Sequence, residues 1–344
     1  MPFKKRHIVY FLLAFIVAAF LSTYQLPYYI YTPGSADPLT SIVEVEGGYE
    51  SEGEMHLVTV SGGQATPLSY LFAKIFSYHD IYPLEQIRPE GVSEEEYIQA
   101  QLQMMESSQE ASVVVAYEAA EKEVTIDYEG VYVVSVEEEM PAFGKLEMAD
   151  RIVGIDGQVI KEASDLIDYI DEKEEGDLVT LEVIRNEEHL EVDIELARFK
   201  DEALADRVGI GIHLVTDREV TVDPPVHFSS GKIGGPSAGL MFALEIYDQL
   251  TEEDLTKGYK IIGTGEIDYE GNVHRIGGVD KKVIAADRAG CDIFFVPFEQ
   301  GAENSNYKVA KKTAEEINTD MKIVPVDTFE EALTYLKELE PKQD

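Results

Sequence analysis

The chain has 344 residues, enough for two domains that each bury a core. Asp and Glu number 67 against 28 Lys and Arg, which gives a formal net charge of −39 at pH 7. Such a surface repels polyanions and excludes a nucleic-acid-binding function. The acidic residues are spread along the chain, so we interpret them as solvated surface. A face that recruits basic substrates is the alternative.

The N-terminal segment is an unbroken apolar run from Ile8 to Leu21, with basic residues before it and tyrosines after it. Extended over residues 8–26, it would form a helix of roughly 28 Å, close to the thickness of a bilayer core. The basic residues predict a cytoplasmic tail at residues 1–7, and the tyrosines are typical of a membrane interface. A retained anchor would place residues 35–344 outside the cytoplasm. A cleaved signal peptide is the alternative, because the run also fits its apolar region.

Residues 35–122 contain the first predicted group of elements. Alternating apolar residues predict strands over 42–46 and 56–60. A short apolar stretch predicts a helix over 67–76. Ser93 followed by three glutamates is typical of a capped helix start, and we expect that helix to run from 93 to about 121.

A separate unit is predicted over residues 125–198. It contains a strand at 130–136, a helix at 163–172 and a hairpin that joins strands at 178–185 and 189–196. The last group of elements, over residues 205–340, begins with strands at 209–215 and 219–222. A glycine-rich loop at 229–235 and an apolar helix at 238–250 follow. Strands and helices then alternate to residue 339. We expect an α+β fold for the chain as a whole.

Ser237 lies between the glycine-rich loop and the apolar helix, in Gly-Gly-Pro-Ser-Ala-Gly. A serine at a helix start lies near unpaired N–H groups that can hold an oxyanion, here around Gly235, Pro236 and Ala238. The alternative is that Ser237 only caps the helix. The stretch also matches GxSxG of α/β-hydrolases, but only His274 follows, too soon for that fold. The serine therefore needs another base.

Lysine can act as that base when burial keeps it neutral. Lys281 and Lys282 open a predicted helix, and periodicity mildly favours Lys282 as the buried one. The alternative for either is a solvated surface charge. Cys291 is the only cysteine, so no intrachain disulfide forms, and we expect it to be buried in a strand. The sequence contains neither CxxC nor HExxH, so neither a metal nor another cofactor is expected.

Several motifs follow one another in a set order: Gly-Pro-Ser-Ala-Gly, Gly-Thr-Gly-Glu-Ile, Gly-Asn-Val-His-Arg-Ile-Gly-Gly, Lys-Lys-Val-Ile-Ala-Ala-Asp-Arg-Ala-Gly and Phe-Val-Pro-Phe. This order and spacing resemble the proteolytic domain of Lon proteases, the S16 family, over about residues 205–340. The resemblance implies that Ser237 is the nucleophile and Lys282 the general base. It also implies that Thr264 lies beside the lysine. Lon-like domains often form hexamers, so a homo-oligomer is expected from the resemblance.

Residues 125–198 resemble a PDZ domain, through Leu-Glu-Met-Ala-Asp-Arg-Ile-Val-Gly-Ile-Asp-Gly. PDZ domains capture extended C-termini by strand addition. The residues expected to receive a peptide are Gly130, Val131, Tyr132 and Val133. Since residues 35–122 resemble the start of a Lon proteolytic domain, the PDZ-like unit is predicted to be an insertion. The arrangement resembles the YlbL and SepM group of Gram-positive bacterial proteases.

The resemblance implies a membrane-anchored serine endopeptidase that cleaves small membrane or secreted proteins and peptides outside the cytoplasm. No GxxxxGK[ST] motif occurs, so the activity is expected to be independent of ATP. A shared membrane would raise the effective concentration of such substrates. The alternative is a non-catalytic membrane scaffold that binds partner C-termini through its PDZ-like unit.

Overall fold

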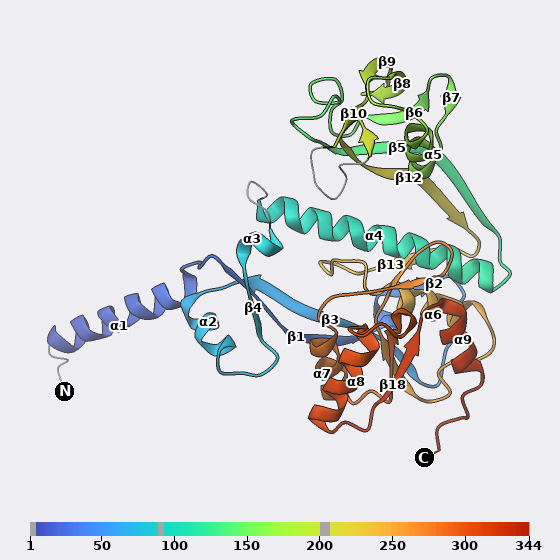
Figure 1. Ribbon diagram of the computed structural model, residues 1–344. Helices are drawn as coiled ribbons and strands as arrows, with labels where there is room; N and C mark the ends of the chain where they lie inside the picture. The colour runs from blue at the N-terminus through green and yellow to red at the C-terminus, as the bar shows by residue number, and fades with distance from the viewer. Residues whose placement is uncertain (1–4, 89–92, 200–206, 344) are drawn as a thin grey trace. The chain divides into compact units, whose positions relative to one another are not determined.

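A computed structural model describes residues 5–88, 93–199 and 207–343 (Figure 1). The chain divides into two compact units. Unit 1 consists of residues 1–123 and 222–344, and unit 2 of residues 124–221. Unit 2 is therefore an insertion in the sequence of unit 1, and each unit has its own core.

Unit 1 begins with elements that precede the insertion. They are α1 (Lys5–Thr23), β1 (Tyr28–Pro38), β2 (Val43–Val45), β3 (Glu54–Gln64), α2 (Pro67–Ala73), β4 (Asp80–Pro83), α3 (Leu84–Ile87) and α4 (Glu94–Ala119). After the insertion come β13 (Val226–Phe228), α6 (Gly239–Leu250), β14 (Lys260–Gly263), β15 (Glu266–Ile267), β16 (Val273–His274), α7 (Val279–Arg288), β17 (Ile293–Pro297), α8 (Asn306–Ile317), β18 (Lys322–Val326) and α9 (Phe329–Lys337). Two short 3₁₀ turns, Leu39–Ser41 and Glu299–Gly301, complete the unit.

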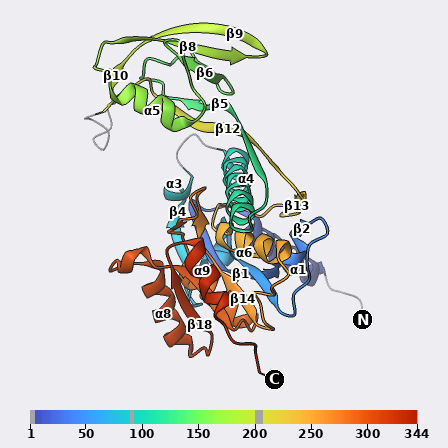
Figure 2. The same cartoon turned by 90° about the vertical axis from the view of Figure 1, so that its right-hand side faces the viewer.

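A mixed six-stranded sheet organises unit 1, in the order β18-β17-β14-β3-β1-β4. Its first four strands are parallel to one another, whereas β1 pairs antiparallel with both β3 and β4. Helices α7 and α8 pack on one face, and α6 and α9 on the other. Figure 2 shows α4 crossing above α6, against which it packs. The predicted helix at 93–121 is confirmed, with Ser93 accepting a hydrogen bond from the backbone N–H of Glu96 as its N-cap.

One core cluster of unit 1 lies between the sheet and the helices α7 and α8. Phe294 and Val296 of β17 are fully buried and pack with Val283 of α7 and Ala310 of α8. Cys291 is buried in the same cluster, as a small apolar residue would be. The predicted burial of this thiol is therefore confirmed, but Cys291 lies two residues before β17 rather than in a strand.

The N-terminal region differs from the prediction in two ways. The transmembrane span predicted over 8–26 is not supported: within the described ranges, no helix is long and apolar enough to cross a membrane. Helix α1 ends at Thr23, three residues before the predicted end at residue 26. Tyr28, Tyr29 and Tyr31 lie in β1, because aromatic residues also favour strands.

Unit 2 is built around an antiparallel sheet. Its elements are β5 (Val124–Val136), β6 (Arg151–Ile155), β7 (Gln158–Val159), α5 (Ala163–Asp171), β8 (Leu178–Arg185), β9 (Glu188–Glu195), β10 (Ala197–Arg198), β11 (Val208–Gly209) and β12 (Ile212–Val222). The sheet order is β12-β5-β6-β8-β9, with β7 paired to β6.

The boundary predicted at residue 205 needs correction. Strands β11 and β12, which the sequence analysis assigned to the catalytic domain, belong almost entirely to unit 2. Ile210 is buried in the same cluster as Val131 and Ile152, and its carbonyl accepts a hydrogen bond from the Ala142 N–H. These contacts complete the core and the edge of the sheet in unit 2, which the linear order of elements does not reveal.

Candidate active site

The candidate active site lies at the carboxyl end of β14, between the start of α6 on one face of the sheet and the start of α7 on the other. Ser237 precedes α6 on one face of the sheet, and Lys282 lies in the first turn of α7 on the other. Thr264 follows β14 directly and lies between them. In open sheets of this kind, ligands bind beyond the carboxyl ends of the strands.

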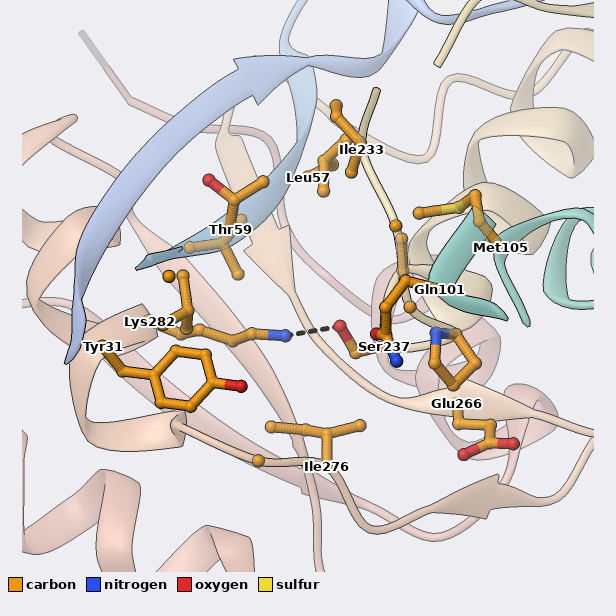
Figure 3. A pocket seen from close by; sticks show the side chains of 18 of the residues that line it. Tyr31, Leu57, Thr59, Gln101, Met105, Ile233, Ser237, Glu266, Ile276 and Lys282 are labelled. Atoms are coloured by element: carbon orange, nitrogen blue, oxygen red, sulfur yellow. Dashed lines mark hydrogen bonds between the residues drawn. The ribbon is translucent and has the colours of Figure 1, made fainter. Parts of the chain in front are cut away.

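Ser237 and Lys282 are in hydrogen-bonding contact, as Figure 3 shows. Lys282 Nζ lies 2.6 Å from Ser237 Oγ. Ser237 does not cap α6: the N-cap residue is Ala238, and its side chain makes no capping bond. The capping role considered for this serine is therefore wrong, and its hydroxyl faces the lysine instead.

Lys282 is 3% exposed. Burial lowers the pKa of its amine from 10.5 to about 7, because an ammonium ion loses its hydration there. The positive end of α7 acts in the same direction, since the lysine lies in the first turn. At neutral pH a large fraction of Lys282 is therefore the free base that a proton transfer from serine requires.

Thr264 orients this pair. Its hydroxyl donates to the Ser237 carbonyl at 3.0 Å and accepts from Lys282 Nζ at 2.8 Å. Because the Thr264 O–H donates to the Ser237 carbonyl, the Thr264 oxygen can only accept a hydrogen bond from an N–H of Lys282. The lone pair of neutral Lys282 is then free to receive the Ser237 proton. The structure places Thr264 where the resemblance predicted it, fully buried beside the lysine.

Lys281 is also buried, at 2% exposure, although periodicity mildly favoured Lys282 as the buried lysine. Burial alone would lower the pKa of Lys281. A hydrogen bond to Asp80 and the charge of Asp280 outweigh that effect, so its pKa is raised and it stays an ammonium ion. The Lys281 ammonium therefore forms ion pairs with Asp80 and Asp280.

The loop before Ser237 is held by α4. The Gly235 N–H donates to the Gln101 carbonyl at 2.7 Å, and the Ser108 hydroxyl donates to the Pro236 carbonyl at 2.8 Å. Gly235 has φ +87°, which favours glycine at this turn. Sequence analysis missed Ser108. A signal existed, because Ser108 and Ser112 interrupt the apolar face of the helix at a spacing of four residues.

Two backbone donors remain for an oxyanion. Of the residues predicted to supply them, Pro236 has no N–H and Gly235 already bonds to Gln101. The N–H groups of Ser237 and Ala238 make no hydrogen bond within the described parts of the chain. They lie at the start of α6, where the helix dipole favours negative charge. The prediction of a backbone oxyanion site is thus narrowed to these two groups.

A cleft of about 610 Å³ contains the pair. Figure 3 shows Leu57, Met105 and Ile276 around Lys282 and Ser237. One wall is β3, which pairs with β14 only from Glu54 to Leu57. Beyond Leu57 this edge of β3 has no partner strand in the described structure, and residues 57–60 line the cleft. An extended peptide can add to such an edge.

Unit 2 has a smaller groove of about 180 Å³. It lies between α5, with Leu166 and Ile170, and the segment from Val208 to Leu214. Strand β12 is the edge of the sheet, so its outer side is available for strand addition.

The peptide-receiving residues predicted in this unit were misplaced. Gly130, Val131, Tyr132 and Val133 lie in β5, an interior strand between β12 and β6. Val131 and Val133 are at most 1% exposed. An interior strand has no free edge for a peptide, so any such site lies at β12 instead. The repeated glycine in Val-Gly-Ile-Gly-Ile, residues 208–212, could have indicated this segment.

In the described ranges, no three His, Cys, Asp or Glu side chains gather as the ligands of a metal ion would.

Comparisons with known proteins find two domains, with a boundary close to the predicted residue 205 rather than at the end of unit 2 at residue 221. Residues 203–338 match the model of the Lon protease (S16) C-terminal proteolytic domain. Residues 98–196 match that of the PDZ domain. The second range begins inside α4, which packs in unit 1, whereas the compact unit begins at Val124. The predicted resemblances are confirmed: residues 205–340 are similar to a Lon-type proteolytic domain, and residues 125–198 are similar to a PDZ domain.

Individual relatives are similar over limited lengths. Lon protease of Escherichia coli strain K12 is 29% identical over 154 residues, 45% of this chain and 18% of that protein. Lon protease of an Aster yellows witches'-broom phytoplasma is 35% identical over 102 residues, 30% of this chain and 12% of that protein. The chain thus spans less than a fifth of these relatives.

Among solved structures, the PDZ domain of an SdrC-like protein from Listeria monocytogenes is 37% identical. The match covers 26% of this chain and 93% of that one, with a TM-score of 0.24. The corresponding domain from Listeria innocua is 40% identical, with coverages of 25% and 93% and a TM-score of 0.23.

Proposed function

We propose that the protein is a serine endopeptidase in which Ser237 is the nucleophile and Lys282 the general base. The contact of 2.6 Å between Lys282 Nζ and Ser237 Oγ carries this proposal, because it joins the serine to an amine whose pKa is near neutral. A nucleophile and a base within hydrogen-bond distance are the minimum for acyl transfer.

The reaction follows from the geometry. Neutral Lys282 takes the Ser237 proton as Oγ attacks the carbonyl carbon of a peptide bond. The N–H groups of Ser237 and Ala238 hold the oxyanion of the tetrahedral intermediate. As the C–N bond breaks, the Lys282 ammonium protonates the leaving amine. Water then hydrolyses the acyl-enzyme, with Lys282 again as the base.

Extended chains are the substrates that suit this cleft. The free edge of β3 supplies backbone groups to an unfolded segment, whereas a folded protein would not present its scissile bond in that form. The sequence has no nucleotide-binding motif of the GxxxxGK[ST] type, and we propose that hydrolysis needs no ATP. Cleavage of an unfolded protein only after ATP is added would contradict this.

The central test replaces Ser237 with Ala. Purified wild-type protein is incubated with a mixture of unstructured peptides, and the products are identified by mass spectrometry. Ser237→Ala should release no products, whereas Ser107→Ala, which changes an exposed serine on α4, should retain wild-type rates. Equal product patterns from wild type and Ser237→Ala would refute the endopeptidase.

We further propose that the groove between α5 and β12 binds the C-terminus of a substrate. Its apolar lining and free strand edge fit an extended peptide, and the groove lies in the unit that matches a PDZ domain. A peptide with a free carboxylate should bind Ser237→Ala protein more tightly than the same peptide with an amidated end, measured by calorimetry. Equal affinities would exclude carboxylate recognition.

A non-catalytic scaffold remains the competing function. Under that hypothesis, C-terminal peptides bind, yet no peptide is cleaved by the wild type. The extracytoplasmic location and the hexamer stay predictions. Cell fractionation with protease accessibility tests the first, and the mass of the purified assembly, measured by light scattering against 38.4 kDa per chain, tests the second.

A further inference from the structure

The outward side of α2 is apolar and exposed, and it lies outside the cleft of the candidate active site. Five large apolar side chains of α2 and of the turn that continues it are between 40% and 75% exposed: Leu68, Leu71, Phe72, Ile75 and Phe76. Their spacing of three and four residues places them along one side of the segment. The opposite side is held by the fold, because Tyr70 and Ala73 pack with Ile30 of β1.

Helix α1 extends this apolar surface. It contacts α2 within unit 1, and Figure 1 shows α2 next to the C-terminal end of α1. The consecutive side chains from Ile8 to Leu13 are each at least half exposed, and because about 3.6 residues complete a helical turn they cover every side of the helix. Such a helix fits surroundings that are apolar on all sides, as lipid is, whereas a protein partner would cover one side only.

The distribution of charge in the sequence also favours lipid as the partner of this surface. The chain carries 67 Asp and Glu residues, yet residues 1–36 and 55–79, which contain α1 and α2, have none. With His neutral, the charged side chains of these two stretches are all basic, namely Lys4, Lys5, Arg6 and Lys74. The phosphates of lipid headgroups repel acidic side chains and attract basic ones. In a protein of net charge −39, the apolar surface therefore lies where headgroups can approach.

The outward side of α2 is already arranged as a binding surface. The rings of Phe72 and Phe76 stack with their centroids 5.9 Å apart. Thr66 caps the helix by accepting a hydrogen bond from the Ser69 N–H, which fixes the start of the segment. Contiguous exposed apolar side chains mark sites of contact with protein or with lipid. Helices that lie in a membrane interface carry Phe and Leu on the side that enters the lipid, as α2 does.

We propose that the outward side of residues 68–76 lies in the interface of a phospholipid bilayer next to α1 and docks unit 1 on the membrane surface. The apolar side chains enter the boundary between headgroups and acyl chains, where such helices are buried by about 5–10 Å. This contact requires no helix that spans the bilayer, and it is independent of the chemistry at Ser237. Gly62, which lines the cleft, lies on β3 shortly before α2, so docking holds the cleft near the lipid.

The test uses tryptophan fluorescence, because the chain contains no tryptophan and a single introduced one reports only its own surroundings. Leu71→Trp and Ile75→Trp place it on the outward side of α2. Each full-length variant is reconstituted into phosphatidylcholine vesicles, with and without bromine on the acyl chains, which quenches tryptophan on contact. Both variants should lose fluorescence in the brominated vesicles. Bromine near the headgroup end of the acyl chain should quench more than bromine near its methyl end, because the contact is interfacial.

Tyr49→Trp is the matched control, because Tyr49 is 49% exposed and precedes β3, whereas α2 follows it. The 11 residues of β3 separate the two positions by roughly 33 Å, so this tryptophan should not be quenched. Equal quenching of all three variants, or of none, would overturn the docking surface. So would emission from position 75 at shorter wavelength without quenching, because protein such as a second copy would then cover it. Peptide cleavage by the same variants is measured in parallel, and retained cleavage without quenching would leave the endopeptidase intact.

Discussion

Lys281 and Lys282 are neighbours in the first turn of α7 and equally buried, yet only Lys281 contacts carboxylates. Its ammonium bonds to Asp80 and Asp280, whereas the recorded bonds of Lys282 reach only the hydroxyls of Ser237 and Thr264. Among the described residues, no acidic side chain pairs with Lys282. Two neighbouring lysines with little exposed surface therefore differ in charge: Lys281 has carboxylate partners, whereas burial acts on Lys282 without them.

The pH dependence of hydrolysis should report Lys282. Its free-base form is the active one, and its pKa is about 7, so kcat/KM should fall about tenfold per pH unit below that value and level off above it. The profile is measured with an uncharged peptide, alongside circular dichroism to confirm folding at each pH. If kcat/KM instead rose with a midpoint near pH 10, as expected for a solvated lysine, the base would not be a buried amine.

The two lysines should respond differently to substitution. Lys282→Met removes the base and should lower kcat by about a thousandfold or more. Lys281→Met should keep kcat within about tenfold, because Asp80 is 44% exposed and can be solvated once its partner is lost. Steady-state kinetics on both variants decides this.

Asp80→Asn is the companion to Lys281→Met, since it removes the other partner of the same ion pair. Neither change should move the acidic limb of the pH profile. A displaced limb would show that Lys281 controls the charge of its neighbour, and equal losses from both lysine variants would undo the assignment of the base.

Thr264 should act as a positioning residue. Thr264→Val is close in shape but removes both the acceptor for Lys282 and the donor to the Ser237 carbonyl. We expect kcat to fall about 10- to 100-fold with little change in KM, as small misalignments at a site can cause. Thr264→Ser, which restores the hydroxyl, should recover most of the rate. If valine and serine behave alike, the hydroxyl has no role.

Stability should depend on pH through Glu245 in α6. Burial raises the pKa of this carboxyl to about 7, so the folded protein keeps a proton that the unfolded chain loses near pH 4.5. Its contribution to stability is therefore present below about pH 4.5 and lost as pH rises towards 7. Relative to wild type, Glu245→Gln should become more stable by about 1–3 kcal/mol between pH 5 and pH 8.

Urea unfolding at both pH values measures this difference. Glu253→Gln, at an exposed position just after the same helix, is the control and should show no such trend. A constant difference between wild type and Glu245→Gln at the two pH values would mean that Glu245 titrates like an exposed carboxyl.

Two predictions of the sequence analysis lacked the information that strand pairing supplies. The tyrosines at residues 28–31 fit both a membrane interface and a strand, and composition cannot separate the two. Only the pairing of β1 with β3 and β4 identifies the strand. Likewise, Gly130 to Val133 were expected to receive a peptide from the PDZ resemblance alone, but the pairing of β12, about 80 residues later, makes β5 an interior strand.

By itself, the sequence determined the order of the motifs, the serine at a helix start and the lysine pair at another, because these depend on local spacing along the chain. Only the tertiary structure decided which lysine could be neutral. Asp80, 201 residues away, pairs with Lys281, while Ser237 and Thr264 meet Lys282 from two other segments. The pKa of a buried amine depends on the charges and dipoles that the fold brings near it, and adjacent positions in the chain do not specify these.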